Sequence, residues 1–228
     1  MRLDLTVCLF YNNNNKDVSV LENYHVSETF KIIQKEGNNL FEKLSTSQYR
    51  LVRKRMIECI LATDMANHAH HFNYFKSKLE SLQISNGNNL QNLITQDTDK
   101  DYLLKNNEMQ QMILSNCVHT SDLGVPAKPR EISDKFAKLV YFEFFKQGDI
   151  EKEKGLPVSF LCDRTTTNVF KSQVGFINYI VLPQFSLMHN LLPEIQYYID
   201  NIQENLKYYQ QMASTKNLNI IQKDKLNV

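Results

Sequence analysis

Apolar residues recur at helical spacing in several separate segments of this chain. After Ser19, which we interpret as a helix N-cap, the apolar positions of residues 20–33 fall near one helix face. The same spacing predicts helices over residues 46–82 with a break near His68, and over residues 99–118, 131–147, 165–181 and 193–213. The pattern therefore predicts an all-α fold.

Proline, glycine and polar runs punctuate these helices. Pro126 ends the 99–118 segment, Gly148 stops the next helix, and Pro183 ends the 165–181 helix. The chain has only 6 glycines and 5 prolines in 228 residues, which favours long helices over a β-rich domain rich in turns. Residues 12–15 and 85–99 are polar and predict loops. No internal repeat is visible, so we expect one domain over residues 1–213 and a polar, disordered tail over residues 214–228.

Composition excludes several classes of protein. Apolar residues make up 42% of the chain, charged residues 22%, and the net charge is +1, which gives no basis for nucleic-acid binding. The apolar stretches are shorter than the roughly 18 residues that a membrane span needs. Four cysteines without a CxxC pair indicate reduced thiols rather than a disulfide framework. We therefore expect a cytoplasmic protein with no membrane span and no signal peptide.

Five strings carry more specific information. In chain order they are SVLENYH at 19–25, ILATDM at 60–65, HTSDL at 119–123, EFF with QGD within 143–149, and KSQVGFI at 171–177. In order and approximate spacing they resemble the motifs of the class I 3′,5′-cyclic-nucleotide phosphodiesterase catalytic domain. Together they span nearly the whole chain, and five strings in the right order are far more specific than any one of them.

The resemblance implies a multi-helix domain of the HD superfamily that hydrolyses cAMP or cGMP to the 5′-nucleotide. In this family two divalent metals, zinc and magnesium, bridge an activated hydroxide, and a histidine protonates the departing 3′ oxygen. Two cations lower the pKa of the bridging water and neutralise charge that grows on the phosphate oxygens. The expected partner is thus a cyclic nucleotide.

The resemblance assigns the metal site residue by residue. Asp122 matches the aspartate that binds the tighter metal. Four further positions match groups that orient metal-bound waters and histidine ligands: Glu22, His25, Thr63 and Asp64. Tyr24 stands where the family has the first histidine of a pair, so that position departs from the pattern.

A base pocket is implied by KSQVGFI. Gln173 and Phe176 lie at i and i+3 of a predicted helix, so an amide that matches a purine edge would lie one turn from a stacking ring. By alignment, Val140 forms the opposite jaw of the clamp, and Phe145 and Leu161 line the pocket. Val125 stands where cAMP-selective members often carry asparagine, so the choice between cAMP and cGMP stays open.

Two motifs of the family have no counterpart in this sequence. The H-N-x-x-H string holds the general acid, the H-D pair holds further ligands, and the residues before Ser19 contain no histidine. We therefore expect an N-terminally truncated domain without a catalytic histidine, with doubtful metal binding and weak activity by this chain alone. The missing helices, or another protein, would cover core surface left exposed. We expect His68, His70 and His71 to form an exposed helix turn rather than a substitute metal site.

Three interpretations remain. The first is a phosphodiesterase domain whose N-terminal part is missing from this sequence. The second is a non-catalytic paralogue, a pseudoenzyme, that binds nucleotide or another protein. The third is a helical scaffold, which the pairing of Gln173 and Phe176 disfavours because a scaffold needs no amide beside an aromatic clamp.

Overall fold

The computed structural model describes residues 18–86 and 105–214. Within those ranges the regular elements are all helical, as the apolar spacing predicts. The chain divides into two compact units. The N-terminal unit ends at Asp122 and also includes residues 190–192, and the C-terminal unit begins at Leu123. Each unit is described by itself below.

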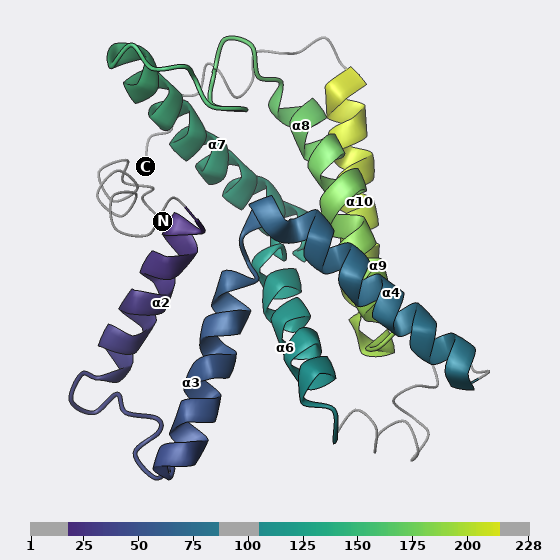
Figure 1. Cartoon of the computed structure of the whole chain (residues 1–228). Helices are drawn as coiled ribbons and strands as arrows, with labels where there is room; N and C mark the ends of the chain where they lie inside the picture. The colour runs from purple at the N-terminus through teal and green to yellow at the C-terminus, as the bar shows by residue number, and fades with distance from the viewer. Residues whose placement is uncertain (1–17, 87–104, 215–228) are drawn as a thin grey trace. The chain divides into compact units, whose positions relative to one another are not determined.

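The described α-helices of the N-terminal unit are 14 to 19 residues long (Figure 1). Its described elements are α2 (Val20–Ile33), α3 (Thr46–Leu61), the 3₁₀ turn η1 (Met65–Asn67), α4 (His68–Asn86) and α6 (Asn107–Asp122). Helix α3 packs against both α2 and α6. Its start is well defined, because Ser45 and Gln48 form a reciprocal capping box that satisfies two backbone N–H groups.

The break between α3 and α4 lies earlier than the spacing predicts. Helix α3 stops at Leu61, and Asp64 accepts a hydrogen bond from the Ala66 backbone N–H at 2.9 Å, which starts η1. The expected N-cap of α2 is also corrected. Ser19 precedes that helix in a left-handed conformation, φ 47°, but it makes no capping hydrogen bond. Its hydroxyl donates to Asp64 Oδ2 at 2.7 Å instead.

Helices α4 and α6 are joined by a buried pair of histidines. His68 Nδ1 and His119 Nε2 are 2.8 Å apart, and the two side chains are buried. The expectation of an exposed histidine turn is therefore wrong for His68, because its ring packs against that of His119 on α6. His70 is exposed and stacks on Tyr74. The predicted start of the α6 segment, residues 99–104, lies outside the described residues.

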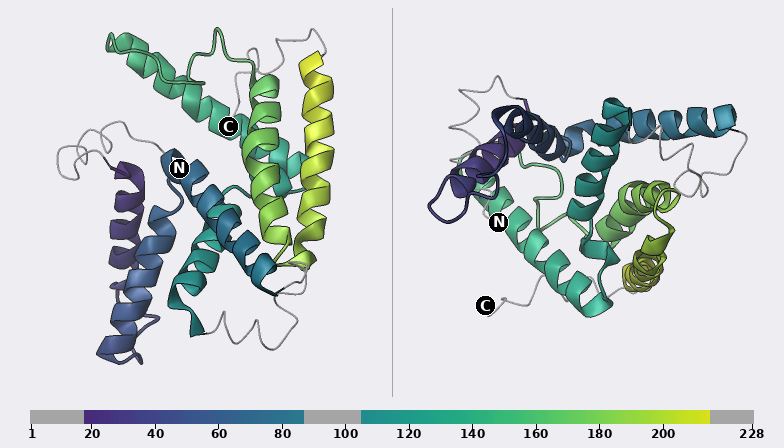
Figure 2. Two further views of the ribbon diagram at one scale, coloured as in Figure 1. Left: turned by 45° about the vertical axis from the view of Figure 1, so that its right-hand side comes forward. Right: turned by 90° about the horizontal axis from the view of Figure 1, so that it is seen from below.

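The C-terminal unit has a core between the helices at its carboxyl end. Its elements are η3 (Val125–Ala127), α7 (Arg130–Glu153), α8 (Val169–Phe176), the π-helical turn η4 (Ile177–Val181), α9 (Leu182–His189), η5 (Pro193–Ile195) and α10 (Gln196–Ser214). Helix α10 runs beside α8 and α9, which both further views show (Figure 2). Ile177, Val181 and Ile202 are fully buried at this contact.

A buried asparagine fastens the start of this unit to its last helix. Asn205 on α10 donates to the carbonyl oxygens of Pro126 at 2.8 Å and Lys128 at 2.9 Å. One carbonyl belongs to Pro126 inside the η3 turn and the other to Lys128 just after it, and Pro126 itself has no backbone N–H to donate. A buried amide that satisfies them removes a cost of about 1–3 kcal/mol per orphaned polar group.

Two predicted helix ends are wrong. Gly148 lies inside α7, which continues to Glu153. A Cβ at this glycine would lie 2.0 Å from the Cys162 carbonyl oxygen, so the position serves close packing of a loop and not termination. Pro183 is the second residue of α9 and follows the π turn η4. Proline is tolerated there because η4 does not rely on the i to i−4 hydrogen bonds that proline breaks.

None of the described helices is both long and apolar enough to cross a membrane. The predicted tail, residues 214–228, lies outside the described residues apart from Ser214, the last residue of α10.

The close approach at Gly148 predicts a large asymmetry between two helical glycines. Gly148→Ala should lower the free energy of unfolding by about 1–3 kcal/mol, because the new methyl group must displace the Cys162 backbone. Gly175→Ala on α8 meets no atom within 4 Å and should raise it by roughly 0.5–1 kcal/mol. Urea denaturation of the three chains measures both. Equal effects at the two positions would contradict the packing described here.

The histidine pair predicts acid sensitivity. Burial, with smaller contributions from His68 and His71, lowers the pKa of His119 to about 4. Because the unfolded chain binds this proton near pH 6.5, the stability present above that pH is lost progressively as pH falls from about 6.5 through the folded-state pKa of about 4. Between pH 7 and 4.5 wild type should lose about 2–3 kcal/mol more than His119→Gln, measured by urea denaturation. His70→Gln, at an exposed position, should follow wild type; a shared pH profile for His119→Gln and wild type would refute the assignment.

Candidate functional site

Four ionisable residues from separate segments of the N-terminal unit come together electrostatically. Glu22 and His25 lie one turn apart on α2, Asp64 follows α3, and Asp122 is the last residue of α6. The Glu22 carboxyl feels the charges of Asp64, His25 and Asp122, and that of Asp122 feels His25. We call these four residues the carboxylate cluster. The fold thus gathers four of the five residues that the resemblance assigns to the metal site and its support.

Asp64 holds the cluster in place. Its Oδ2 accepts from the Ser19 hydroxyl at 2.7 Å and from Asn67 Nδ2 at 3.1 Å, while Oδ1 accepts from the Ala66 N–H. The first bond links the start of α2 to the turn after α3 across 45 residues of sequence. It therefore sets the position of Glu22, one turn into α2, relative to Asp64.

The surroundings of the cluster make the carboxyl groups of Glu22 and Asp122 harder to ionise, because they raise the pKa of both. Burial raises the pKa of Glu22, and Asp64 and Asp122 raise it further, against its backbone hydrogen bond and His25. Desolvation by the surrounding protein also raises the pKa of Asp122, although this residue is exposed and His25 partly offsets the shift. A cation bound among these groups would reverse both shifts.

The fifth residue, Thr63, is turned to the backbone. Its hydroxyl donates to the Ile60 carbonyl oxygen at 2.7 Å. In the described ranges, 18–86 and 105–214, no three histidine, cysteine, aspartate or glutamate side chains are arranged to hold a metal ion. The donor set of this chain fits a divalent cation in charge, through Asp122 and its acidic neighbours, and does not by itself form a complete ligand sphere.

Gln173 in the C-terminal unit is held by a tyrosine. It lies on α8 with 9% of its surface exposed. The Tyr141 hydroxyl on α7 shares hydrogen bonds with the side chains of Ser172 and Gln173, which lower the pKa of that hydroxyl against the larger effect of burial. The amide expected to meet the purine is therefore already oriented. Sequence reasoning missed Tyr141, although its i, i+4 spacing to Phe145 is a detectable signal.

The remaining residues of the expected base pocket divide into two groups. Phe145 and Leu161 pack in one cluster with Tyr141 and Val169. Phe176 packs instead against the core formed by α8, η4, α9 and α10. Val140 is 39% exposed on α7. The fold thus links Gln173, through Tyr141, to Phe145 and Leu161, and it does not place Val140 or Phe176 in that cluster.

A buried glutamate positions the loop that carries Leu161. Glu151 is 5% exposed, and its carboxylate accepts from the Ser159 N–H at 2.7 Å, the Ser159 hydroxyl at 2.7 Å and Gln147 Nε2 at 2.8 Å. Although removal from water raises the pKa of Glu151, these hydrogen bonds together lower it. Leu161, two residues beyond Ser159, adopts φ 65°, a left-handed conformation that costs a non-glycine residue roughly 1–2 kcal/mol. Such strain persists only where the surroundings impose it.

Comparison with known proteins identifies the family of this chain. The family model described as 3′5′-cyclic nucleotide phosphodiesterase matches residues 5–202. The 3′,5′-cyclic-AMP phosphodiesterase, isoform F, of Drosophila melanogaster is 36% identical over 207 residues, 90% of this chain and 29% of that protein. The 3′,5′-cyclic-AMP phosphodiesterase 4C of Rattus norvegicus is 36% identical over 205 residues, 90% of this chain and 35% of that protein. The chain therefore spans about a third of the length of these curated relatives.

A solved structure gives the same result for the fold. The phosphodiesterase domain of the RhoPDE fusion protein from the choanoflagellate Salpingoeca rosetta superposes with a TM-score of 0.72 at 29% identity, covering 91% of this chain and 59% of that chain. The all-α, phosphodiesterase-like fold expected from the sequence is confirmed. Because the family match covers most of the sequence, from residue 5 to residue 202, this chain belongs to the 3′,5′-cyclic nucleotide phosphodiesterase family.

Proposed function

We propose that the domain to which this chain belongs hydrolyses 3′,5′-cyclic nucleotides to 5′-nucleotides with the help of two divalent metals. The observation that carries the proposal is the carboxylate cluster, in which α2, the turn after α3 and the end of α6 bring Glu22, Asp64 and Asp122 together against their mutual repulsion. Membership of the family supports the reaction class.

In this proposal Asp122 binds a metal directly, and Glu22, His25, Thr63 and Asp64 orient waters or other ligands. Zinc and magnesium are the expected ions, and when bound they supply an activated water and neutralise phosphate charge. The raised pKa values of Glu22 and Asp122 support this role, because a bound cation would offset the burial and the like charges that raise them. Asp64 acts through position, since its carboxylate oxygens already accept three hydrogen bonds.

The C-terminal unit supplies the base pocket. We assign Gln173 to the purine edge, Phe145 and Leu161 to the pocket wall, and Phe176 and Val140 to the aromatic clamp. The buried amide of Gln173, oriented by Tyr141, supports the first assignment. Preorganisation of this kind lowers the entropic cost of binding. The two named relatives are cyclic-AMP phosphodiesterases, so cAMP is the first substrate to test.

In the non-catalytic alternative the base pocket binds a cyclic nucleotide, but the chain does not hydrolyse it. In it the chain binds a cyclic nucleotide without hydrolysis, because His25 is the one histidine of the carboxylate cluster and is assigned to support rather than to proton donation. We expect this chain alone to hydrolyse cyclic nucleotide at best slowly. Binding of cAMP with no release of 5′-nucleotide under any metal condition would favour the alternative.

The role of Asp122 can be tested by thermal unfolding, without an assay of hydrolysis. Because the fold raises the pKa of this carboxyl, its contribution to stability is present at low pH and is lost as pH rises through the folded-state value. Asp122→Asn should therefore raise the thermal midpoint of the metal-free chain at pH 7.5 by about 1–3 °C. Zinc or magnesium should stabilise wild type and not the variant. Asp200→Asn, at an exposed position on α10, should change neither result; equal metal stabilisation of Asp122→Asn would remove Asp122 from the site.

Gln173 gives the second prediction. Gln173→Ala should weaken cAMP binding roughly tenfold or more, since two hydrogen bonds to the base are lost at about 0.5–1.5 kcal/mol each. Isothermal titration of the chain with cAMP and cGMP measures this, with Gln196→Ala on α10 as the matched control. Chromatography of the same samples with zinc and magnesium reports any 5′-nucleotide.

Unchanged cAMP affinity in Gln173→Ala would contradict the assigned pocket. Metal-dependent hydrolysis at an ordinary enzymatic rate would refute the expected weakness of this chain while supporting the proposed reaction.

A further inference from the structure

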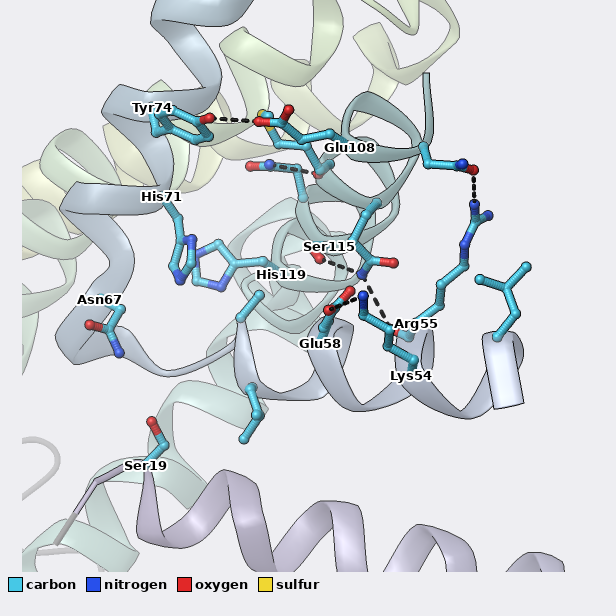
Figure 3. Close-up of a pocket in the computed structure, with 17 residues that line it drawn as sticks. Ser19, Lys54, Arg55, Glu58, Asn67, His71, Tyr74, Glu108, Ser115 and His119 are labelled. Carbon is cyan, nitrogen blue, oxygen red and sulfur yellow. Dashed lines mark hydrogen bonds and ion pairs between the residues drawn. The ribbon is translucent and has the colours of Figure 1, made fainter. Parts of the chain in front are cut away.

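Two surface features of the protein lie outside the sites described above. The first is an open cavity of about 700 Å³ between α3, α4 and α6 (Figure 3). Acidic and basic side chains both line it, among them Lys54, Glu58 and Glu108, so its chemistry does not select one class of ligand. The second feature is the outer face of α7 in the C-terminal unit, whose residues are more selective.

Helix α7 carries large apolar side chains on two opposite faces. Tyr141 and Phe145 are buried, as expected for the inner face of a surface helix. On the other side of the helix, Ile132, Leu139 and Phe142 are 46%, 38% and 51% exposed. A surface helix normally turns charged residues to solvent, and a group of exposed apolar side chains indicates a contact surface.

The exposed residues of α7 form one stripe along the helix. From Ile132 they recur at intervals of three and four residues, which places them on one side of the helix, and Glu131 adjoins the first of them. We define the α7 stripe as Glu131, Ile132, Lys135, Leu139, Phe142 and Lys146. All of these residues are exposed, and the side chains of its three charged members have no ion pair or hydrogen bond within ranges 18–86 and 105–214.

The α7 stripe is complementary to its own reversed copy. Glu131 and Lys146 stand at its two ends, and Leu139 lies at its middle. Two antiparallel copies with a two-fold axis near Leu139 therefore place each Glu131 opposite Lys146 of the second copy. The same register places each Lys135 opposite Phe142, where an ammonium group can lie over the ring. Reciprocal contacts of this kind are what a two-fold interface requires.

Charge selects this register over its neighbours. A slip of one helical turn in one direction would place Lys135 opposite Lys146. A slip of one turn in the other direction would place Glu131 opposite Glu143. Both slips bring like charges together, and such repulsion excludes the wrong pairing as effectively as attraction favours the right one.

We propose that this protein forms a two-fold dimer in which the α7 stripes of two copies pack antiparallel. The stripe is about 22 Å long, and one side of a helix is about 10 Å wide. This contact is smaller than the roughly 800 Å² per partner of a standard interface, so the dimer is reversible, with a Kd on the order of 10–100 µM. The proposal is independent of the proposed function, because the stripe contains no residue of the carboxylate cluster or the base pocket.

Sedimentation velocity of the full chain tests the dimer. Between about 1 and about 200 µM the weight-average sedimentation coefficient should rise from the monomer value toward that of the dimer. Leu139→Glu sets two carboxylates against each other at the two-fold axis and should weaken association at least tenfold. Leu114→Glu makes the same substitution on α6, at a position that is 41% exposed, and should leave association unchanged.

A charge exchange tests the antiparallel register. Glu131→Lys alone and Lys146→Glu alone each oppose like charges at both ends of the contact, and each should weaken the dimer at least fivefold. An equimolar mixture of the two variants should associate about as tightly as wild type, because every lysine then faces a glutamate. Lys207→Glu, at an exposed position on α10, should have no effect. Recovery on mixing cannot come from a folding defect, and thermal unfolding verifies that each variant folds.

Three results would overturn the proposal. A monomer over the whole concentration range would show that the α7 stripe does not bind a second copy, and would leave another protein or another part of the domain as its partner. A dimer that Leu139→Glu leaves unchanged would place the contact elsewhere. A mixture of the two charge variants that associates no more tightly than either alone would refute the antiparallel pairing.

Discussion

The carboxylate of Asp64 is the constraint on which the N-terminal unit depends. Placed directly after α3, it starts the η1 turn through the Ala66 N–H and reaches back to the hydroxyl of Ser19. One side chain therefore caps the η1 turn that follows α3 and also binds the residue that precedes α2. If Ser19 capped α2 in the usual way, its hydroxyl oxygen would accept a hydrogen bond from a backbone N–H of that helix. Instead the hydroxyl donates to Asp64 and joins the start of α2 to the turn after α3.

The same fastening creates the unfavourable electrostatics of the site. It holds Glu22 close enough to Asp64 and Asp122 for their charges to oppose its ionisation, and burial adds to this effect. A protein selected for stability alone would separate these groups or pair each with a base. The cluster keeps the carboxylates of Glu22 and Asp122, although the fold opposes their ionisation. In the function proposed above these groups would face a cation, and a site of that kind commonly trades stability for function.

The C-terminal unit solves a different problem, which is to hold a loop rigidly against a helix. Gly148 lets the backbone at Cys162 approach α7, and the buried carboxylate of Glu151 binds Ser159 nearby. These two anchors explain how Leu161 keeps a left-handed backbone and packs with Tyr141 and Phe145. Tyr141 in turn orients Gln173, so the rigidity of the loop and that of the amide arise from one connected set of contacts.

The sequence by itself determined the all-α class, the course of most helices and the family, because helical periodicity is local and because short motifs survive where chemistry restricts the residue type. It also pointed to Glu22, Asp64 and Asp122 through those motifs. Only the tertiary structure decided what depends on contacts between distant segments. Gly148 looked like a helix end because its lack of a side chain is a local signal, while its true role depends on Cys162. Ser19 looked like a cap, and His68 looked exposed, until Asp64 and His119 were placed beside them. Backbone preference is encoded residue by residue, but the partner of a buried polar group is chosen only when the helices pack.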